Sequence, residues 1–189
     1  MVLKIVGYGH PALRKHNEEV PRDYPGLEEL IQNMFETMYN AHGVGLAGPQ
    51  VAVNYRIFVV DGEPMEDVAQ EEGESLKGFK RVFINPVILE EEGEEWAFEE
   101  GCLSIPDIRE EVNRQGTIRI RYLDINFQEQ EETLSGLKAR IVQHEYDHIE
   151  GVLFTDHLSP LRRRMIKKRL NRIAAGDVDL RYPMKFKLT

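Results

Sequence analysis

The short stretch HEYDH at residues 144–148 constrains the fold of this chain more than any other feature. Residues four apart lie on one face of an α-helix, so its two imidazoles can converge on one metal ion only if the stretch is helical. Leu137 and Ile141 precede the histidines at helical spacing and extend the same face as an apolar stripe. The sequence therefore predicts a helix whose metal-binding face points into the protein.

The composition fits one enclosing domain. The chain has 189 residues, of which 41% are hydrophobic and 30% charged, a balance that favours a folded protein over disorder. We expect residues 1–189 to form a single domain. No run approaches the roughly 18 consecutive apolar residues of a membrane span, and the N-terminal residues lack the features of a signal peptide. One cysteine excludes an internal disulfide, so we expect a reducing, cytoplasmic location.

Apolar spacing predicts both helices and strands. Helical periodicity covers residues 27–41 and a basic, exposed helix is expected at 160–175. Runs rich in β-branched and aromatic residues predict strands at 55–60, 82–89, 96–98 and 117–125. Pro86 indicates an edge or a bulge in the second of these strands. Because the strands do not alternate strictly with helices, we expect an α+β fold with mixed or antiparallel strands around the metal-binding helix.

Three segments are expected to be irregular. Residues 43–50 are too rich in glycine for regular structure, and residues 129–132 are polar and typical of a turn. The acidic stretch at 62–78 lacks strong periodicity, which indicates a solvated loop or insertion.

Two histidines leave the metal site incomplete, because catalytic sites usually have three protein ligands and one open position for water. The metzincin pattern would place the third ligand at Phe154, which cannot bind a metal. No glutamate follows Glu150, so a distant downstream glutamate is excluded. The downstream candidates that remain are Asp156, His157, Asp177 and Asp179. Upstream, the only thiol of the chain, Cys102, lies in the stretch EEGCLSIP.

Three motifs taken together resemble those of the peptide deformylase family. They are GVGLAGPQ at residues 43–50, EGCLS at 100–104 and QHEYDH at 143–148. The resemblance runs from the N-terminus to about residue 160. Gly48 departs from the usual alanine, a loss of one methyl group that should not disturb a site built from backbone amides. The resemblance implies an enzyme that removes the N-terminal formyl group from formyl-methionine of newly synthesised polypeptides.

The resemblance also implies a metal centre. Cys102, His144 and His148 would hold one divalent ion, and Glu145 would move a proton from water to the leaving amine. A set of one thiolate and two imidazoles suits Zn²⁺, Fe²⁺, Co²⁺ or Ni²⁺. Ligand chemistry alone makes Zn²⁺ the default, whereas the family resemblance favours Fe²⁺.

Further roles follow from the same resemblance. The Gln50 side chain and the backbone N–H of Leu103 would stabilise the oxyanion of the tetrahedral intermediate. Gly45 would offer a main-chain contact to the peptide. Val44, beside the glycine turn, and Ile141, three residues before the first histidine, would form walls of a pocket for the methionine side chain.

Other polar residues near the motifs have more than one interpretation. Arg109 matches the spacing at which family members place an arginine near the substrate backbone, but a surface ion pair would give the same pattern. Glu100 and Asp147 are each able to orient a ligand or an arginine.

The C-terminal segment is basic while the rest of the chain is acidic. Residues 159–189 carry ten Lys or Arg against two Asp, whereas the preceding residues carry 14 basic and 31 acidic side chains. A solvated helix explains this pattern as well as docking does. Because formyl-peptides emerge from ribosomes, we consider weak, salt-sensitive contact with ribosomal RNA. We expect nascent N-formyl-methionyl peptides as substrates and no membrane or DNA partner.

Two competing functions remain at this point. An endopeptidase with the same helix motif would need a downstream ligand that the sequence does not convincingly offer. A non-catalytic metal-binding or ribosome-associated protein would need neither Glu145 nor Gln50.

Overall fold

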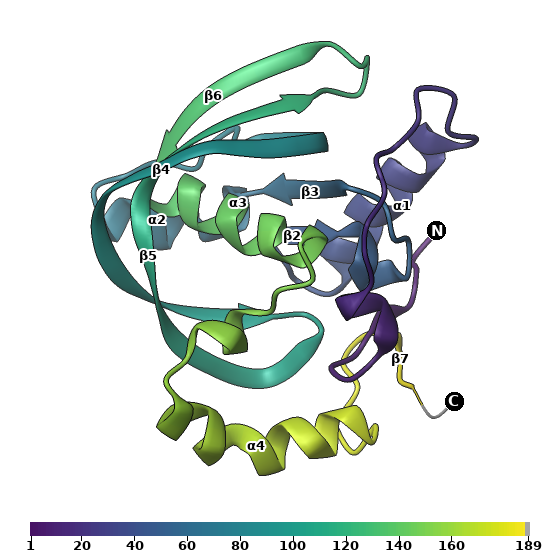
Figure 1. The fold of residues 1–189 in the computed structure, drawn as a ribbon, viewed down its shortest axis with the longest axis vertical. Coiled ribbons are helices and arrows are strands. Elements are labelled where there is room, and N and C mark those ends of the chain that lie inside the picture. Colours follow the sequence, from purple (N-terminus) through teal and green to yellow (C-terminus); the bar gives the residue numbers. More distant parts are fainter. Residues whose placement is uncertain (188–189) are drawn as a thin grey trace.

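The structure, a computed structural model, describes residues 1–187 and confirms the α+β class (Figure 1). Its main sheet has five antiparallel strands in the order β2-β3-β4-β5-β6, and a second sheet pairs β1 with β7 in parallel. The strands are β1 (Ile5–Val6), β2 (Gly45–Ala47), β3 (Ile57–Asp61), β4 (Lys80–Cys102), β5 (Ile105–Leu123), β6 (Glu129–Ser135) and β7 (Met184–Lys185).

The predicted metal-binding helix lies at the centre of the fold. The α-helices are α1 (Leu27–Asn40), α2 (Glu66–Glu71), α3 (Gly136–Ile149) and α4 (Pro160–Ala174). Short 3₁₀ helices are η1 (Pro11–Arg14), η2 (Gly48–Val51), η3 (Glu63–Met65) and η4 (Phe154–His157). Strands β4 and β5 curve around α3 and end beneath it, between α3 and α4 (Figure 1). None of the described helices is long and apolar enough to cross a membrane.

The long hairpin of β4 and β5 explains how the second motif reaches the helix. Side chains along β5 alternate between buried and exposed, as expected for a strand with one face on a core. The register shifts between Ile84 and Val87, so the bulge predicted at Pro86 is confirmed. The hairpin closes where Cys102 pairs with Ile105. The sheet therefore delivers the only thiol of the chain to the inner end of β4.

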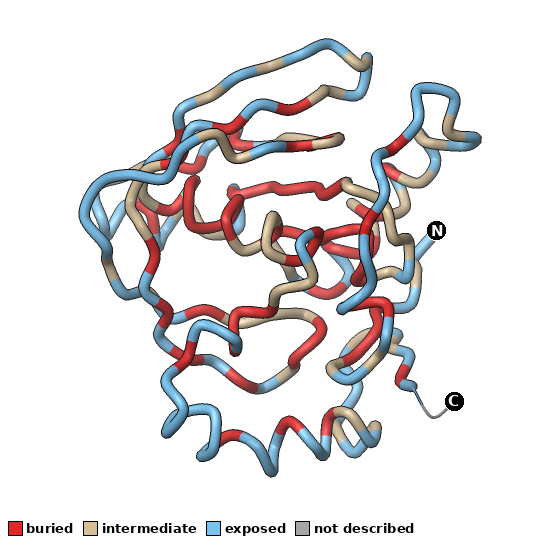
Figure 2. The backbone as a smooth tube through the Cα atoms, viewed as in Figure 1, coloured by how far each residue is buried: buried red, intermediate tan, exposed pale blue. Residues whose placement is uncertain are grey.

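Three apolar clusters hold the elements in place. One fills the space between α3 and the main sheet, a second joins α4 to β5 and the N-terminal residues, and a third packs α1 against β3. Figure 2 shows that β3 is buried and that α3 has only buried and half-buried residues, whereas α4 is mostly exposed with a few buried positions. The burial of α3 agrees with the apolar stripe that its sequence predicts.

Four expectations from the sequence need correction. Residues 43–50 are not irregular, because they contain β2 and the start of η2. Residues 129–132 begin strand β6, which was obscured by its polar, largely exposed edge position. Helix α2 lies within 62–78, so this acidic segment is not a loop throughout. Helix α4 is not exposed on all sides, because its Ile166, Leu170 and Ile173 are buried.

Candidate metal centre and active site

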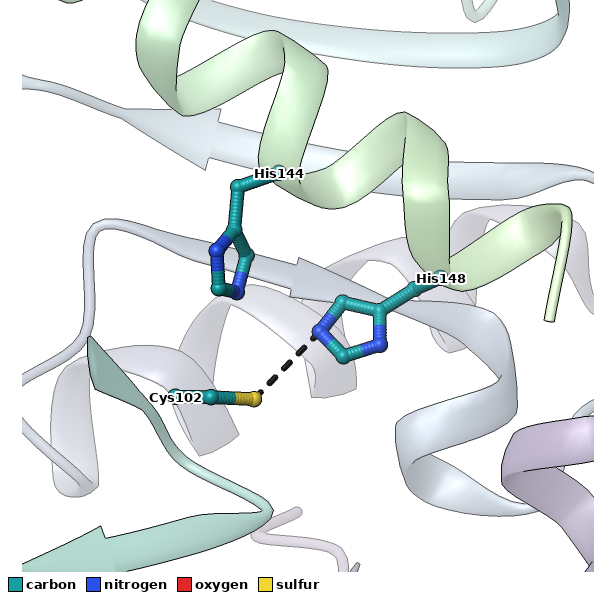
Figure 3. A group of neighbouring side chains, drawn as sticks. All are labelled: Cys102, His144 and His148. Carbon is teal, nitrogen blue, oxygen red and sulfur yellow. Dashed lines mark hydrogen bonds between the residues drawn. The ribbon is translucent and has the colours of Figure 1, made fainter. Parts of the chain in front are cut away.

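The structure brings Cys102 together with the two histidines of α3 (Figure 3). One ligand atom from each of Cys102, His144 and His148 lies within 4.8 Å of the other two. The thiol sulfur is 3.4 Å from Nε2 of His148. The helix places both imidazoles on one face, and the β4–β5 hairpin approaches that face from below. A thiol and two imidazoles this close form a donor set of the size that one metal ion requires.

The tautomer of His144 is set by a buried carboxylate. Its Nδ1 lies 3.0 Å from Oε2 of Glu100, so Nε2 is left to face the thiol. Glu100 also accepts hydrogen bonds from Arg114 at 2.7 Å and from Arg140 at 3.1 Å. Burial would raise the pKa of Glu100, but the bonds to His144 and Arg114 outweigh burial and hold it well below its ordinary value. Glu100 is therefore a fixed negative charge behind the cluster.

His148 is suited to bind a cation as a neutral ligand. Burial lowers its pKa well below the ordinary value, so the imidazole stays unprotonated. Within residues 1–187, its Nδ1 is buried and has no hydrogen-bond partner, while its Nε2 faces Cys102. The residues present thus fit a divalent ion of borderline softness. The structure does not bring the downstream candidates to this cluster, since His157 Nε2 lies 2.7 Å from Oδ2 of Asp147 instead.

Glu145 is buried beside the cluster rather than exposed on the helix surface. It is 5% exposed, and among the described residues its Oε2 has no hydrogen-bond partner. A Cβ atom on Gly45 would overlap the Glu145 carboxylate, so a glycine is needed at this point of β2. Burial raises the pKa of Glu145 to about 7. A nearby divalent cation would favour the charged form and lower that pKa.

Gln50 faces the same cluster from η2. Its side-chain oxygen accepts from the Ala47 N–H at 2.9 Å, which directs the amide nitrogen to the opposite side. That nitrogen donates to Oγ of Ser104 at 3.2 Å and lies 3.5 Å from Sγ of Cys102. Leu103 occupies the turn between β4 and β5, directly after the thiol. An uncharged side-chain donor and the hairpin turn therefore flank the cluster.

A cavity of about 530 Å³ opens beside these groups. The expected pocket residues Val44, Gly45, Ile141 and Arg109 all line it, together with Phe98. Arg109 is exposed and forms an ion pair with Glu99 at 3.0 Å, so the surface-pair interpretation of this arginine describes its contact in the structure.

Two parts of the cavity wall were missed from the sequence. Met65 and Val68 come from η3 and α2 in the acidic segment 62–78, and Glu74 of that segment accepts from the Leu137 N–H at 2.9 Å, at the start of α3. Arg181 and Tyr182 come from the C-terminal segment after α4. The apolar pair at 65 and 68 is a recognisable helical signal, but nothing local indicates that it faces a cavity.

The two acidic residues with open roles have distinct partners. Glu100 holds His144, as described above, whereas Asp147 accepts from Arg114 at 2.8 Å and contacts His157. Arg114 consequently links the two carboxylates. Tyr146 points to another side of α3, where its ring contacts Arg56.

Fold and cluster together define a metal-dependent hydrolase, and comparison with known proteins identifies its family. The model of the family described as Polypeptide deformylase matches residues 2–164. A peptide deformylase of Flavobacterium johnsoniae is 56% identical over 189 residues, covering 98% of this chain and 96% of the relative.

Solved structures give the same result. A peptide deformylase from Legionella pneumophila aligns with a TM-score of 0.80 and 37% identity, covering 94% of this chain and 98% of that one. One from Plasmodium falciparum aligns with a TM-score of 0.80 and 36% identity, covering 92% and 96%. The chain belongs to the peptide deformylase family, metal-dependent enzymes that remove the formyl group from the N-terminal methionine of nascent polypeptides.

Proposed function

We propose that Cys102, His144 and His148 hold the catalytic metal ion and that Glu145 is the catalytic acid and base. One observation carries this proposal: a thiol and two imidazoles converge within 4.8 Å on one side of a buried, unpaired carboxylate. When bound there, a divalent ion would lower the pKa of water at its open position and polarise the formyl carbonyl. An endopeptidase would not need the thiol as its third ligand, and a non-catalytic metal-binding or ribosome-associated protein would not need the carboxylate.

Glu145 performs the proton transfers in this proposal. Its carboxylate accepts the proton of the attacking water and later donates it to the nitrogen of the leaving amine. Burial favours the protonated form of this carboxyl and a bound divalent cation would favour the charged form, so the two effects oppose each other. Gly45 leaves the room that the carboxylate occupies.

Gln50 and Leu103 stabilise the oxyanion of the tetrahedral intermediate. The amide nitrogen of Gln50 is directed toward the cluster by two fixed hydrogen bonds of the same side chain. The N–H of Leu103 follows the thiol in the tight turn. Donors that are already oriented need no reorganisation when charge develops on the formyl oxygen.

The cavity receives the formyl-methionyl end of the peptide. Val44 and Ile141 line the space for the methionine side chain, and the main chain of Gly45 pairs with the peptide. Arg109, at the rim, contacts the peptide backbone after exchanging its exposed bond to Glu99.

Three finer properties belong to the same proposal. The physiological metal is Fe²⁺, which Zn²⁺, Ni²⁺ or Co²⁺ replaces, since the donor set accepts each of them. The enzyme acts in the cytoplasm, where a lone thiol such as Cys102 stays reduced. Residues 1–189 act as one deformylase domain, with the acidic segment 62–78 as an insertion and the basic segment 159–189 as its C-terminal extension.

The test is formate release from a formyl-Met-Ala-Ser peptide by enzyme purified without oxygen. We expect the wild type to release formate, Cys102→Ser to lose the metal, and Glu145→Gln to keep the metal but lose about 10²-fold or more in kcat. Glu29→Gln, an exposed glutamate on α1, is the matched control and should match the wild type. Normal metal content in Cys102→Ser, or cleavage of internal peptide bonds by the wild type, would contradict the proposal.

We also propose weak docking of α4 on ribosomal RNA. Several basic side chains of α4 are engaged within the protein: Arg162 bonds Glu110, Arg169 bonds the carbonyl of Asp107, and Arg172 bonds Asp177. The exposed basic residues left for docking are Arg163, Arg164, Lys167 and Lys168. Changing these four to glutamine should reduce ribosome co-sedimentation and its salt dependence without exposing the buried face of the helix. Unchanged co-sedimentation would refute docking.

A further inference from the structure

The segment that follows α4 turns back to the active site. Residues 177–187 lie outside the part of the chain that matches the family model, which ends at residue 164. Strand β7 pairs with β1, and backbone bonds join Ile5 to Pro183 and Gly7 to Lys185, each at 2.9 Å. This pairing brings Arg181 and Tyr182 to the wall of the cavity. The tail is therefore positioned to touch the catalytic groups.

Tyr182 makes a direct contact with the turn that carries the oxyanion donor. Its hydroxyl donates to the carbonyl oxygen of Leu103 at 2.7 Å. The turn has only two residues, Leu103 and Ser104, between the cross-strand partners Cys102 and Ile105. The Leu103 carbonyl belongs to the central peptide of this turn. The bond from Tyr182 thus fixes the orientation of this central peptide, which lies outside the hydrogen-bonded ladder between β4 and β5.

Rotation of a central peptide is the main freedom of a β-turn, because common turn types differ in the direction of that carbonyl. Ser104 has a φ outside the left-handed region, so the turn holds one of these alternatives. Ser104 is also held at two atoms: the Tyr8 N–H donates to its carbonyl at 2.8 Å, and Gln50 donates to its Oγ at 3.2 Å. A rotated central peptide would displace Ser104 and, with it, the partner of Gln50.

We propose that Tyr182 is a positioning residue for deformylation, holding the Leu103–Ser104 peptide of the turn so that Ser104 keeps the Gln50 amide directed at the formyl oxygen, beside the Leu103 N–H. This inference rests on the proposed roles of Leu103 and Gln50. It extends the active site to a C-terminal segment that none of the three sequence motifs contains. The hydroxyl of Tyr182 is committed to the Leu103 carbonyl, so it acts through the turn.

A purely structural role of Tyr182 would be to fasten the tail. Other contacts already do so: Arg181 pairs with Asp107 at 3.0 Å, β7 pairs with β1, and Phe186 is buried in the cluster with α4. Removing one hydroxyl should therefore leave the tail in place. The ring of Tyr182 also packs against the α1 cluster and is retained in a phenylalanine variant.

The experiment is steady-state deformylation by Tyr182→Phe in the full-length metal-loaded enzyme. We expect kcat to fall about tenfold, less than the loss of an oxyanion donor itself, with KM within about twofold of the wild type. Metal content and the thermal midpoint should be unchanged. In ¹⁵N spectra, the Ser104 amide should shift, because its nitrogen shares the peptide whose carbonyl loses the bond.

Tyr39→Phe is the matched control, since it removes a tyrosine hydroxyl bonded to Asp61 away from the cavity. It should leave kcat and the Ser104 amide unchanged. A kcat of Tyr182→Phe within twofold of the wild type would overturn the inference, as would a loss of activity explained by lost metal or a lowered thermal midpoint. If the wild type itself released no formate, the proposed function would fail, which is a separate outcome.

Discussion

The hairpin of β4 and β5 carries two sets of ion pairs made from the same residue types, and they differ in burial. At its inner end, Arg114 bonds Glu100 at 2.7 Å, with side chains 6% and 3% exposed. Near the middle of the hairpin, in what we call the outer set, Arg119 bonds Glu90 at 3.5 Å, with side chains 43% and 52% exposed. The inner set contacts His144, a proposed metal ligand, whereas the outer set lies in solvent. Burial, more than pairing, decides what each set contributes.

The physical reason is the dielectric environment. Two charges in solvent attract weakly and are screened by salt, so exposed pairs contribute little to stability. A buried carboxylate is stable only while its partners remain, because an unpaired charge in the interior is costly. Glu100 has three such partners in Arg114, Arg140 and His144. The inner set should therefore respond to single substitutions far more strongly than the outer set.

The largest effect is expected for Glu100→Gln, which keeps the shape of the side chain and removes its charge. Arg140 would lose its counter-charge in the interior and Arg114 would keep only that of Asp147, a cost of about 3–5 kcal/mol in the free energy of unfolding. His144 would also lose the acceptor that sets its tautomer, so metal affinity should fall about 10–100-fold. Urea unfolding and metal competition with a chelator measure the two quantities.

Glu90→Gln, in the outer set on the same strand, is the matched control. It should leave both the unfolding midpoint and metal affinity at the wild-type values. Equal losses of stability and metal affinity in Glu100→Gln and Glu90→Gln would show that burial does not determine what each set of ion pairs contributes.

An intermediate effect is expected where one partner is buried and the other half-exposed. Glu110 in β5 is 7% exposed and accepts from Arg162 of α4, whose side chain is 49% exposed. Arg162→Ala would leave this carboxylate without its charged donor and loosen α4, a loss of about 1–2 kcal/mol. Chemical unfolding measures the loss, and Arg163→Ala on the same helix is the control. Equal stability of the two variants would show that this half-buried pair contributes no more than an exposed arginine does.

The sequence predicts features that have a local pattern and misses those that depend on contacts between distant segments. Periodicity predicts the α3 helix and the α+β class because apolar faces are local signals, and the structure confirms both. The proximity of Cys102 to the helix follows from family motifs, although the roles assigned to these residues stay predictions. Strands were predicted at 82–89 and 96–98. The glutamate-rich residues 90–95, which join them into β4, were missed because they have no apolar alternation and their partners come from β5. The contact of Tyr182 has no local pattern at all.

The partly exposed pair of Arg14 and Asp156 gives a test based on the pH dependence of stability. Burial would raise the pKa of Asp156, but hydrogen bonds from Arg14 and from the Leu153 N–H outweigh it and hold the pKa below its ordinary value of 3.8. Because the folded pKa is depressed, the stabilisation is complete above the ordinary value and is lost as the pH falls through the folded value.

Asp156→Asn should therefore lower the free energy of unfolding by up to about 1 kcal/mol at neutral pH, since solvent screens the pair. The difference from the wild type should shrink as the pH falls below about 4. Urea unfolding at several pH values, with equal metal content in both proteins, measures this trend. A difference that stays constant down to the lowest pH would show that the charge of Asp156 contributes nothing.

The smallest effect on stability is expected for the outer set of ion pairs. Arg119 contacts Glu90 and also Glu131 of β6, at 3.0 Å, in a ladder that the strand hydrogen bonds already hold in register. Arg119→Gln removes the charge while keeping a long polar side chain on an exposed strand face. Since water already weakens the attraction between solvent-exposed charges and added salt weakens it further, the thermal midpoint should change little at physiological ionic strength and still less at high salt. Thermal melts of wild type and variant at low and high salt make this comparison. A large loss of stability that persists in high salt would mean that the outer pairs contribute as the buried ones do, and that exposure is the wrong variable by which to rank the ion pairs of this enzyme.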